Sequence, residues 1–239
     1  MPALNASWRE YLDEKMLPHM WCPGCGNGIA LGALTRALAE LALPRNRVVV
    51  VTGIGCWGKA DDYLATSALH GTHGRALAFA TGVKAARPEL TVIVLMGDGD
   101  GATIGGNHLI HAARRNIDLT AVVLNNQNYG MTGGQVSATT PVDAITSTTM
   151  YGNPERDFDL CRLVDAAGAN YVARGGLPET CPCVQMGLDA CVGDFRTSIS
   201  SYREYHRFRT AVCILRIWNG LTEIRRYGWE NELTVLLLR

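Results

Sequence analysis

Three short runs of β-branched and aliphatic residues alternate with longer segments of helical periodicity, and this alternation constrains the fold most. The apolar runs lie at 47–52, 91–96 and 119–124. Each ends in a turn rich in Gly, Asp or Asn, which is typical of strands buried on both faces of a parallel sheet. The helical segments lie at 29–43, 75–87 and 106–115. Strand and helix in alternation predict an α/β fold with a doubly wound, mostly parallel sheet.

Composition excludes several classes of protein. The chain has 239 residues, of which 47% are hydrophobic, and this is enough for a substantial core. The 22 basic and 22 acidic side chains balance, so no charge excess favours nucleic acid or an anionic membrane as a partner. The longest apolar runs are far shorter than the roughly 20 residues of a membrane span. The N-terminus lacks the apolar core of a signal peptide, so we expect a cytoplasmic protein.

The pattern changes near Gly175, so the sequence predicts one α/β domain over 1–174 and an atypical tail over 175–239. Two segments of the tail, 211–218 and 233–238, have strand character. The tail otherwise lacks a clear period, which fits either a divergent ending or a change of reading frame after about Arg174.

Polar residues follow two neighbouring strands of the predicted sheet. The sequence GDGDG covers 97–101, and Asn125 and Asn126 follow the next strand. Ligands of open α/β sheets bind beyond the carboxyl ends of the strands. Oxygen atoms of Asp98 and Asn126 would suit Mg²⁺ there, and the glycines would let a diphosphate approach the backbone. The alternatives are simple turns, or a calcium loop, which Ala102 excludes because it occupies a required ligand position.

The loop after the first strand has the sequence GIGCWG at 53–58. Its glycine spacing fits a dinucleotide-binding fingerprint, but no acidic residue follows at the distance that a ribose needs. A tight turn explains the same residues.

Cysteines and histidines form two further groups. Cys22 and Cys25 form a CxxC pair, and Cys56 provides a third thiol. Such cysteines can form half of a zinc site, act as a redox dithiol or hold an iron–sulfur cluster. A further ligand would come from Cys161 or the tail. The polar segment 70–75 contains His70 and His73 and opens a helix. It fits an anion site or a helix cap with solvated histidines.

Together these segments resemble the β subunits of the 2-oxoacid:ferredoxin oxidoreductases, most closely those of the 2-oxoglutarate form. The resemblance extends from about Leu17 to about Arg174. The motifs that carry it are PHMWCPGCG at 18–26, GIGC at 53–56, HGTHGRA at 70–76, GDGD at 97–100, IGGNH at 104–108 and NNQNYGMTGGQ at 125–135.

The resemblance implies a thiamine diphosphate-binding fold with bound Mg²⁺ and a [4Fe-4S] cluster. Asp98 and Asn126 would hold Mg²⁺ with their side chains, and Asn128 with its main-chain carbonyl. Cofactor-binding positions would be Ile54, Gly55, Cys56, His73, Gly97, Asp98, Gly99, Asp100, Asn126, Asn128, Tyr129, Gly130, Met131 and Thr132, with Gln135 also lining the pocket. Lys59, His70 and His73 would be catalytic positions that face the carboxylate of the substrate. The cluster ligands would be Cys22, Cys25 and Cys56, with a fourth from Cys191 or Cys213, or less favourably from Cys181 or Cys183.

The implied activity is oxidative decarboxylation of a 2-oxoacid to acyl-CoA and CO₂, or the reverse, with electrons passing to ferredoxin. The enzyme would need an α subunit, in an α2β2 assembly, and coenzyme A. His108 and the pair Arg114 and Arg115 are typical of the 2-oxoglutarate members, but pyruvate or another 2-oxoacid is an alternative substrate. Two competing hypotheses are a thiamine diphosphate decarboxylase or synthase without a cluster, and an inert zinc or iron–sulfur module.

Overall fold

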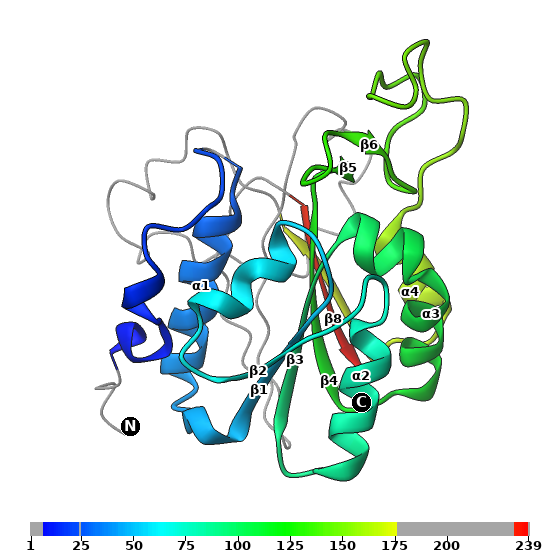
Figure 1. Ribbon diagram of the computed structural model, residues 1–239. Helices are drawn as coiled ribbons and strands as arrows, with labels where there is room; N and C mark the ends of the chain where they lie inside the picture. The colour runs from blue at the N-terminus through cyan, green and yellow to red at the C-terminus, as the bar shows by residue number, and fades with distance from the viewer. Residues whose placement is uncertain (1–6, 24, 176–231, 239) are drawn as a thin grey trace.

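The computed structural model describes residues 7–23, 25–175 and 232–238 and contains a six-stranded sheet flanked by helices (Figure 1). The strands of this sheet are β1 (Val48–Thr52), β2 (Ser67–His70), β3 (Thr91–Gly97), β4 (Leu119–Asn125), β7 (Tyr171–Gly175) and β8 (Glu232–Leu238). Their order is β2-β1-β3-β4-β8-β7. The first four are parallel, and β8 is antiparallel to both of its neighbours. The predicted mostly parallel α/β sheet is therefore confirmed.

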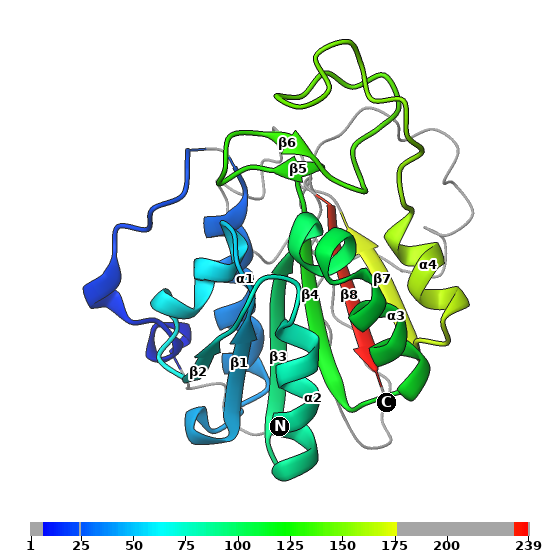
Figure 2. The same ribbon diagram turned by 45° about the vertical axis from the view of Figure 1, so that its right-hand side comes forward.

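Helices cover both faces of the sheet, as Figure 2 shows. The α-helices are α1 (Asn27–Glu40), α2 (Ala76–Ala86), α3 (Gly106–Arg115) and α4 (Leu160–Ala166). The first three agree with the predicted helices to within three residues at each end. Short 3-10 helices lie at η1 (Trp8–Tyr11), η2 (Glu14–Met16), η3 (Arg45–Arg47) and η4 (Trp57–Tyr63). Within the described ranges, no helix combines the length and the apolar character needed to cross a bilayer.

Successive residues of each central strand point to opposite faces, which gives the protein two apolar cores. On β3, Ile93 and Leu95 join the core beneath α1, whereas Val92 and Val94 join the core beneath α2 and α3. A strand that is buried on both faces has no polar positions. This explains why β1, β3 and β4 appear in the sequence as continuous apolar runs.

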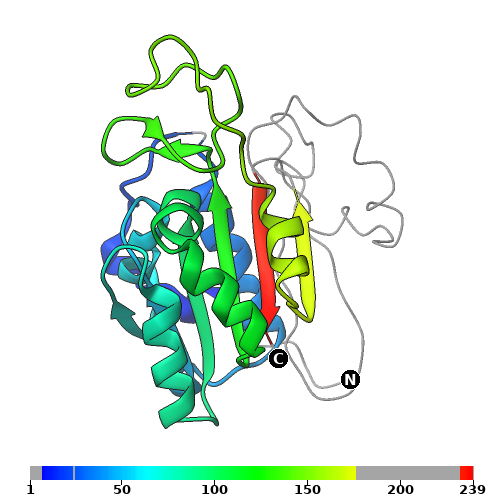
Figure 3. The ribbon, with the colours of Figure 1, turned by 90° about the vertical axis from the view of Figure 1, so that its right-hand side faces the viewer.

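The sheet strands β2 and β7 were not predicted, whereas β8 was. The edge strand β2 has only four residues and three of them are exposed, so no apolar run marks it. The strand β8 confirms the prediction for 233–238, and it lies between β4 and β7 (Figure 3). The other predicted strand of the tail, 211–218, lies outside the described residues.

The segment after β3 differs from the predicted loop over 97–106. Residues Gly99–Ile104 form a π-helical turn that leads through Gly105 into α3. Such turns are often found at functional sites. The segment after β4 forms a small hairpin of β5 (Asn128–Tyr129) and β6 (Gln135–Val136) at the carboxyl end of the sheet. A long loop over 141–158, here called the arm, projects beyond this hairpin (Figures 1 and 2).

Candidate cofactor and substrate site

Asp98 is deeply buried at the carboxyl end of the sheet, with 1% of its surface exposed. It follows β3 directly. The hydroxyl groups of Ser137 and Thr139 donate to its Oδ2 over 2.6 and 2.7 Å. Burial raises the pKa of the Asp98 carboxyl, and the hydroxyl donors oppose this shift. Two side chains from the segment after β6 therefore fix this carboxylate in place.

Asn126 and Asn128 lie beside Asp98 at the end of the next strand. The backbone N–H of Asn126 donates to the Asp98 carboxylate, and the Asn128 Nδ2 donates to the Asn126 carbonyl over 2.8 Å. Both side chains lie against Gly130, where a Cβ atom would stand 3.0 Å from the Asn126 Nδ2 and 3.4 Å from the Asn128 Oδ1. The structure thus brings together the three residues that the sequence predicts as magnesium ligands.

Oxygen atoms from a carboxylate, an amide side chain and a main-chain carbonyl form the kind of donor set that a hard cation takes. The residues present therefore fit Mg²⁺ bound together with a phosphorylated cofactor.

Tyr129 covers Gly99 at the start of the π-helical turn. The Tyr129 hydroxyl donates to the Gly99 carbonyl over 3.2 Å, and a Cβ atom on Gly99 would overlap the ring. The rest of the hairpin turn is more open. Met131 is exposed, and the Thr132 hydroxyl donates to the Gln135 Oε1 over 2.5 Å. The predicted cofactor residues of the 125–135 segment thus form one hairpin above β3 and β4.

Asp100 connects three loops. It is 2% exposed, and its Oδ1 accepts from the backbone N–H groups of Gly74, over 2.6 Å, and Ile54, over 3.3 Å. The His73 Nδ1 lies 2.6 Å from the same oxygen. Gly53 leaves the space that this carboxylate occupies, because a Cβ atom there would overlap it. Within the described part of the chain, Asp100 Oδ2 has no hydrogen-bond partner.

This arrangement accounts for the glycine-rich sequence at 53–58. Gly53 lies against the Asp100 carboxylate, and Gly58 lies against the Gly53 carbonyl, so both positions need a residue without a side chain. Close packing explains the spacing without a nicotinamide cofactor.

Two of the three residues predicted to face substrate, Lys59 and His70, each have an acidic neighbour on η4. The Lys59 Nζ pairs with Asp62 Oδ2 at 2.6 Å, and this hydrogen bond raises the pKa of Lys59. The His70 Nδ1 lies 2.9 Å from Asp61 Oδ2. Both acidic residues were missed in the sequence, because a short 3-10 helix has no periodic pattern that assigns its side chains to a site.

The thiols of Cys22, Cys25 and Cys56 lie within electrostatic reach of one another. Burial raises the pKa of the Cys25 and Cys56 thiols, and the neighbouring thiols raise it further. The Trp21 indole N–H donates to the Cys56 carbonyl over 2.6 Å and so joins the two segments that carry these cysteines.

In the described ranges, no three His, Cys, Asp or Glu side chains converge closely enough to hold a single metal ion. A polynuclear cluster is bound by thiolates at its separate corners, and the donor set of three cysteines fits that kind of group. Cys191 and Cys213, the predicted sources of a fourth thiolate, lie outside the described residues, as do Cys181 and Cys183.

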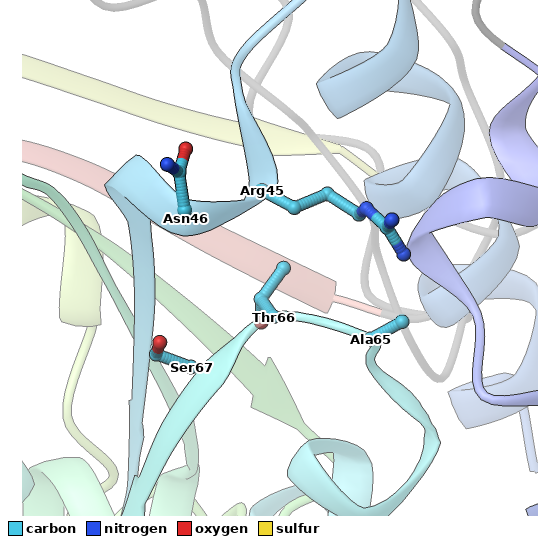
Figure 4. Close-up of a pocket in the computed structure, with 5 residues that line it drawn as sticks. All are labelled: Arg45, Asn46, Ala65, Thr66 and Ser67. Atoms are coloured by element: carbon cyan, nitrogen blue, oxygen red, sulfur yellow. The ribbon is translucent and has the colours of Figure 1, made fainter.

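A separate hollow of about 450 Å³ lies at the opposite, amino end of β1 and β2 (Figure 4). Its lining residues are Arg45, Asn46, Ala65, Thr66 and Ser67. None of them belongs to the loops described above, so this hollow is distinct from the candidate site.

Comparison with known proteins identifies the family of this chain. Residues 53–181 match the C-terminal TPP binding domain of thiamine pyrophosphate enzymes. The 2-oxoglutarate synthase subunit KorB of Archaeoglobus fulgidus is 58% identical over 171 residues, which cover 72% of this chain and 64% of that protein. The KorB subunit of Methanothermobacter thermautotrophicus is 51% identical over 229 residues, covering 93% of this chain and 80% of that protein.

A solved structure is also similar. The 2-oxoglutarate:ferredoxin oxidoreductase of Magnetococcus marinus, with 2-oxoglutarate, coenzyme A and succinyl-CoA bound, aligns with a TM-score of 0.68 and 40% identity. The alignment covers 70% of this chain and 57% of that chain. This chain thus spans less than two thirds of that structure and of the Archaeoglobus relative. The chain belongs to the thiamine pyrophosphate enzyme family and, within it, to the β-type subunits of 2-oxoacid:ferredoxin oxidoreductases that include KorB.

Proposed function

We propose that this chain is the β subunit of a 2-oxoglutarate:ferredoxin oxidoreductase and supplies its site for the diphosphate of thiamine diphosphate. The observation that carries the proposal is the buried carboxylate of Asp98, fixed by two hydroxyl groups and adjacent to Asn126 and Asn128. A carboxylate held in this way is already oriented for a cation before the cation arrives. The similarity to KorB subunits supports the same assignment.

In this proposal Asp98 and Asn126 bind Mg²⁺ with their side chains, and Asn128 binds it with its main-chain carbonyl. Thiamine diphosphate, when bound, supplies the nucleophilic carbon and the electron sink that decarboxylation of a 2-oxoacid requires. The hairpin residues Tyr129, Gly130, Met131 and Thr132 would help to hold the cofactor, together with Ile54 and Gly55 from the loop after β1.

Lys59, His70 and His73 orient the 2-oxoacid. A dicarboxylate substrate carries two negative charges, and cationic or hydrogen-bonding side chains at the carboxyl end of β1 and β2 would hold them. The Lys59 pair with Asp62 is one-third exposed on both sides, so a substrate carboxylate can compete for the ammonium group. The preference for 2-oxoglutarate over pyruvate follows the relatives named above, of which the solved one holds 2-oxoglutarate.

Cys22, Cys25 and Cys56 would hold a [4Fe-4S] cluster together with a fourth thiolate, and the cluster would pass electrons on to ferredoxin. The three thiols lie on two segments that Trp21 joins, so cluster binding would further tie those segments together. Coenzyme A and an α subunit complete the proposed assembly. The α subunit would provide the part of the cofactor site that the described residues of this chain do not supply.

The test combines the full chain, co-expressed with its α subunit, and an Asp98→Asn variant. The wild-type enzyme should reduce ferredoxin only when 2-oxoglutarate, coenzyme A and thiamine diphosphate are all present. Thiamine diphosphate with Mg²⁺ at about 100 times its Kd should stabilise the wild type by roughly 2.7 kcal/mol, or about 5–10 °C in Tm. Asp98→Asn should lose this shift.

Asp118→Asn is the matched control, because Asp118 pairs with Lys84 ahead of β4 and lies away from the cofactor loops. It should keep the full cofactor-induced shift in Tm. A wild-type enzyme without any shift, or an Asp98→Asn variant that keeps it, would contradict the proposed cofactor site. Activity without iron would favour the cluster-free decarboxylase or synthase instead.

A further inference from the structure

A buried carboxylate lies directly behind His70. His70 is the last residue of β2 and stands opposite Thr52 in the register of β1 and β2. The His70 Nδ1 is 2.9 Å from Asp61 Oδ2 and 3.0 Å from the Thr52 Oγ1, and the Thr52 hydroxyl also donates to Asp61 Oδ2 over 3.3 Å. Two polar groups, one from β1 and one from β2, therefore meet at one carboxylate oxygen from η4.

Asp61 and His70 differ strongly in how far their side chains are buried. The Asp61 side chain is 6% exposed, whereas that of His70 is 38% exposed. Among the described residues, no group donates to Asp61 Oδ1, which is also buried. Burying a carboxylate away from water costs free energy unless hydrogen bonds compensate. Within the described part of the chain, Asp61 receives these bonds at Oδ2, from Thr52 and His70.

The hydrogen bond to Asp61 bears on which nitrogen of the His70 ring carries the proton. A carboxylate oxygen accepts hydrogen bonds, so the contact with Asp61 Oδ2 favours the tautomer of His70 in which Nδ1 carries the proton. The Nε2 atom is then the nitrogen left for other partners. A carboxylate that fixes the tautomer and the orientation of a histidine in this way is a recurring feature of hydrolase triads and of metal-binding histidines.

We propose that Asp61 is a positioning residue, which fixes the ring of His70 so that its Nε2 meets the 2-oxoacid substrate. This inference rests on the proposed function, because it takes His70 as a substrate-facing residue. It adds a residue that acts only through His70 and that no sequence motif indicated.

The neighbouring ion pair shows why Asp61, and not Asp62, has this role. Both residues lie on η4, and Asp62 pairs with Lys59. Because the Asp62 side chain is 33% exposed, solvent or a substrate can replace it as the partner of Lys59. The Asp61 side chain is only 6% exposed, so water and substrate have little access to compete for its hydrogen bond to His70.

The experiment is a double-mutant cycle in the complex with the α subunit, with KM for 2-oxoglutarate, KM for coenzyme A and iron content measured for each variant. Asp61→Ala should raise the KM for 2-oxoglutarate roughly tenfold, which is the cost of a lost hydrogen bond of about 1.4 kcal/mol. His70→Ala should have an effect at least as large, and the double variant should be no worse than His70→Ala. The KM for coenzyme A and the iron content should stay unchanged.

Asp165→Ala, which removes an exposed carboxylate on α4, is the control for the loss of an acidic side chain. It should behave as the wild type. Effects of Asp61→Ala and His70→Ala that add in the double variant would overturn the proposal, because Asp61 would then act by another route. An unchanged KM in Asp61→Ala would overturn it as well.

A second measurement does not depend on the enzymatic activity. The ¹⁵N NMR shifts of the six histidines in the full chain report their tautomers, and comparison with His70→Ala assigns the signal of His70. The wild type should show the Nδ1–H form at His70, and Asp61→Ala should show a mixture of tautomers. Asp61→Asn keeps an oxygen acceptor and should retain most of the Nδ1–H form. If the wild-type complex lacked activity, the proposed function would fail, while a mixed tautomer in the wild type would refute the role of Asp61.

Discussion

Trp21 offers a sharp test of how the cysteine segments are held together. The Trp21 side chain is 6% exposed and its ring packs against Tyr63 with 4.9 Å between the ring centroids. Its indole N–H donates over 2.6 Å to the carbonyl of Cys56. Trp21→Phe keeps an aromatic ring in the cluster but removes this donor and part of the ring volume.

The magnitude follows from these two losses. An unsatisfied carbonyl costs about 1–3 kcal/mol, and the cavity left by the smaller ring adds about 1 kcal/mol. A loss of roughly 3 kcal/mol corresponds to a fall in Tm of about 6–12 °C for a chain of this size. Thermal unfolding followed by circular dichroism measures this change in the full chain.

Trp57→Phe is the matched control. Trp57 belongs to the same aromatic cluster, 5.9 Å from Trp21, but its indole N–H donates to the Val122 carbonyl of β4 over 3.3 Å. Both variants should lose stability, but only Trp21→Phe should release iron faster from the anaerobically purified complex. The reason is that the indole N–H of Trp21 bonds to the Cys56 carbonyl, whereas that of Trp57 bonds to β4. Equal rates of iron release from the two variants would refute this reasoning. A Trp21→Phe chain with the same Tm as the wild type would refute it as well.

Two further changes test the packing around the hairpin and the arm. Gly99→Ala should destabilise the chain by about 1–3 kcal/mol and weaken thiamine diphosphate binding, because the new methyl group would overlap the Tyr129 ring. Gly106→Ala is the control: a methyl group there meets open space, so thermal melts should show no change in stability. Asn153 is 2% exposed and its Nδ2 donates to the carbonyls of Thr140, Pro141 and Glu155. Asn153→Ala should therefore raise the rate of proteolytic cleavage within the arm at least tenfold, whereas the Tm for global unfolding of the chain should change little.

The sequence predicts the central part of the fold because burial on both faces leaves a clear signal. The runs that form β1, β3 and β4 contain apolar residues at nearly every position, and the helices between them follow from their spacing. The edge strand β2 has no such signal, because its residues Ser67–His70 are largely exposed. The antiparallel direction of β8 depends on the path of the preceding chain and not on its apolar pattern.

The residues of the candidate site also fall into some that the sequence predicts and others that it does not. Asp98 and Asn126 follow from topology, since the carboxyl ends of adjacent parallel strands must lie together. Ser137 and Thr139 reach Asp98 from 39 and 41 residues further along the chain, and no local pattern predicts contacts over such separations. Asp61 is closer in sequence to His70, but its role depends on the pairing of β1 with a strand that the sequence did not show.

Three buried carboxylates together explain how this edge of the sheet is organised. Asp61, Asp98 and Asp100 each accept hydrogen bonds from a segment other than their own, so they cross-link the loops that follow β1, β2, β3 and β4. The cost of burying these charges is offset by donors that the chain itself provides. Asn126 and Met131, in contrast, are exposed at the same edge. A site with fixed buried groups and exposed groups around them is preorganised, so a ligand can bind to it with little rearrangement of the loops.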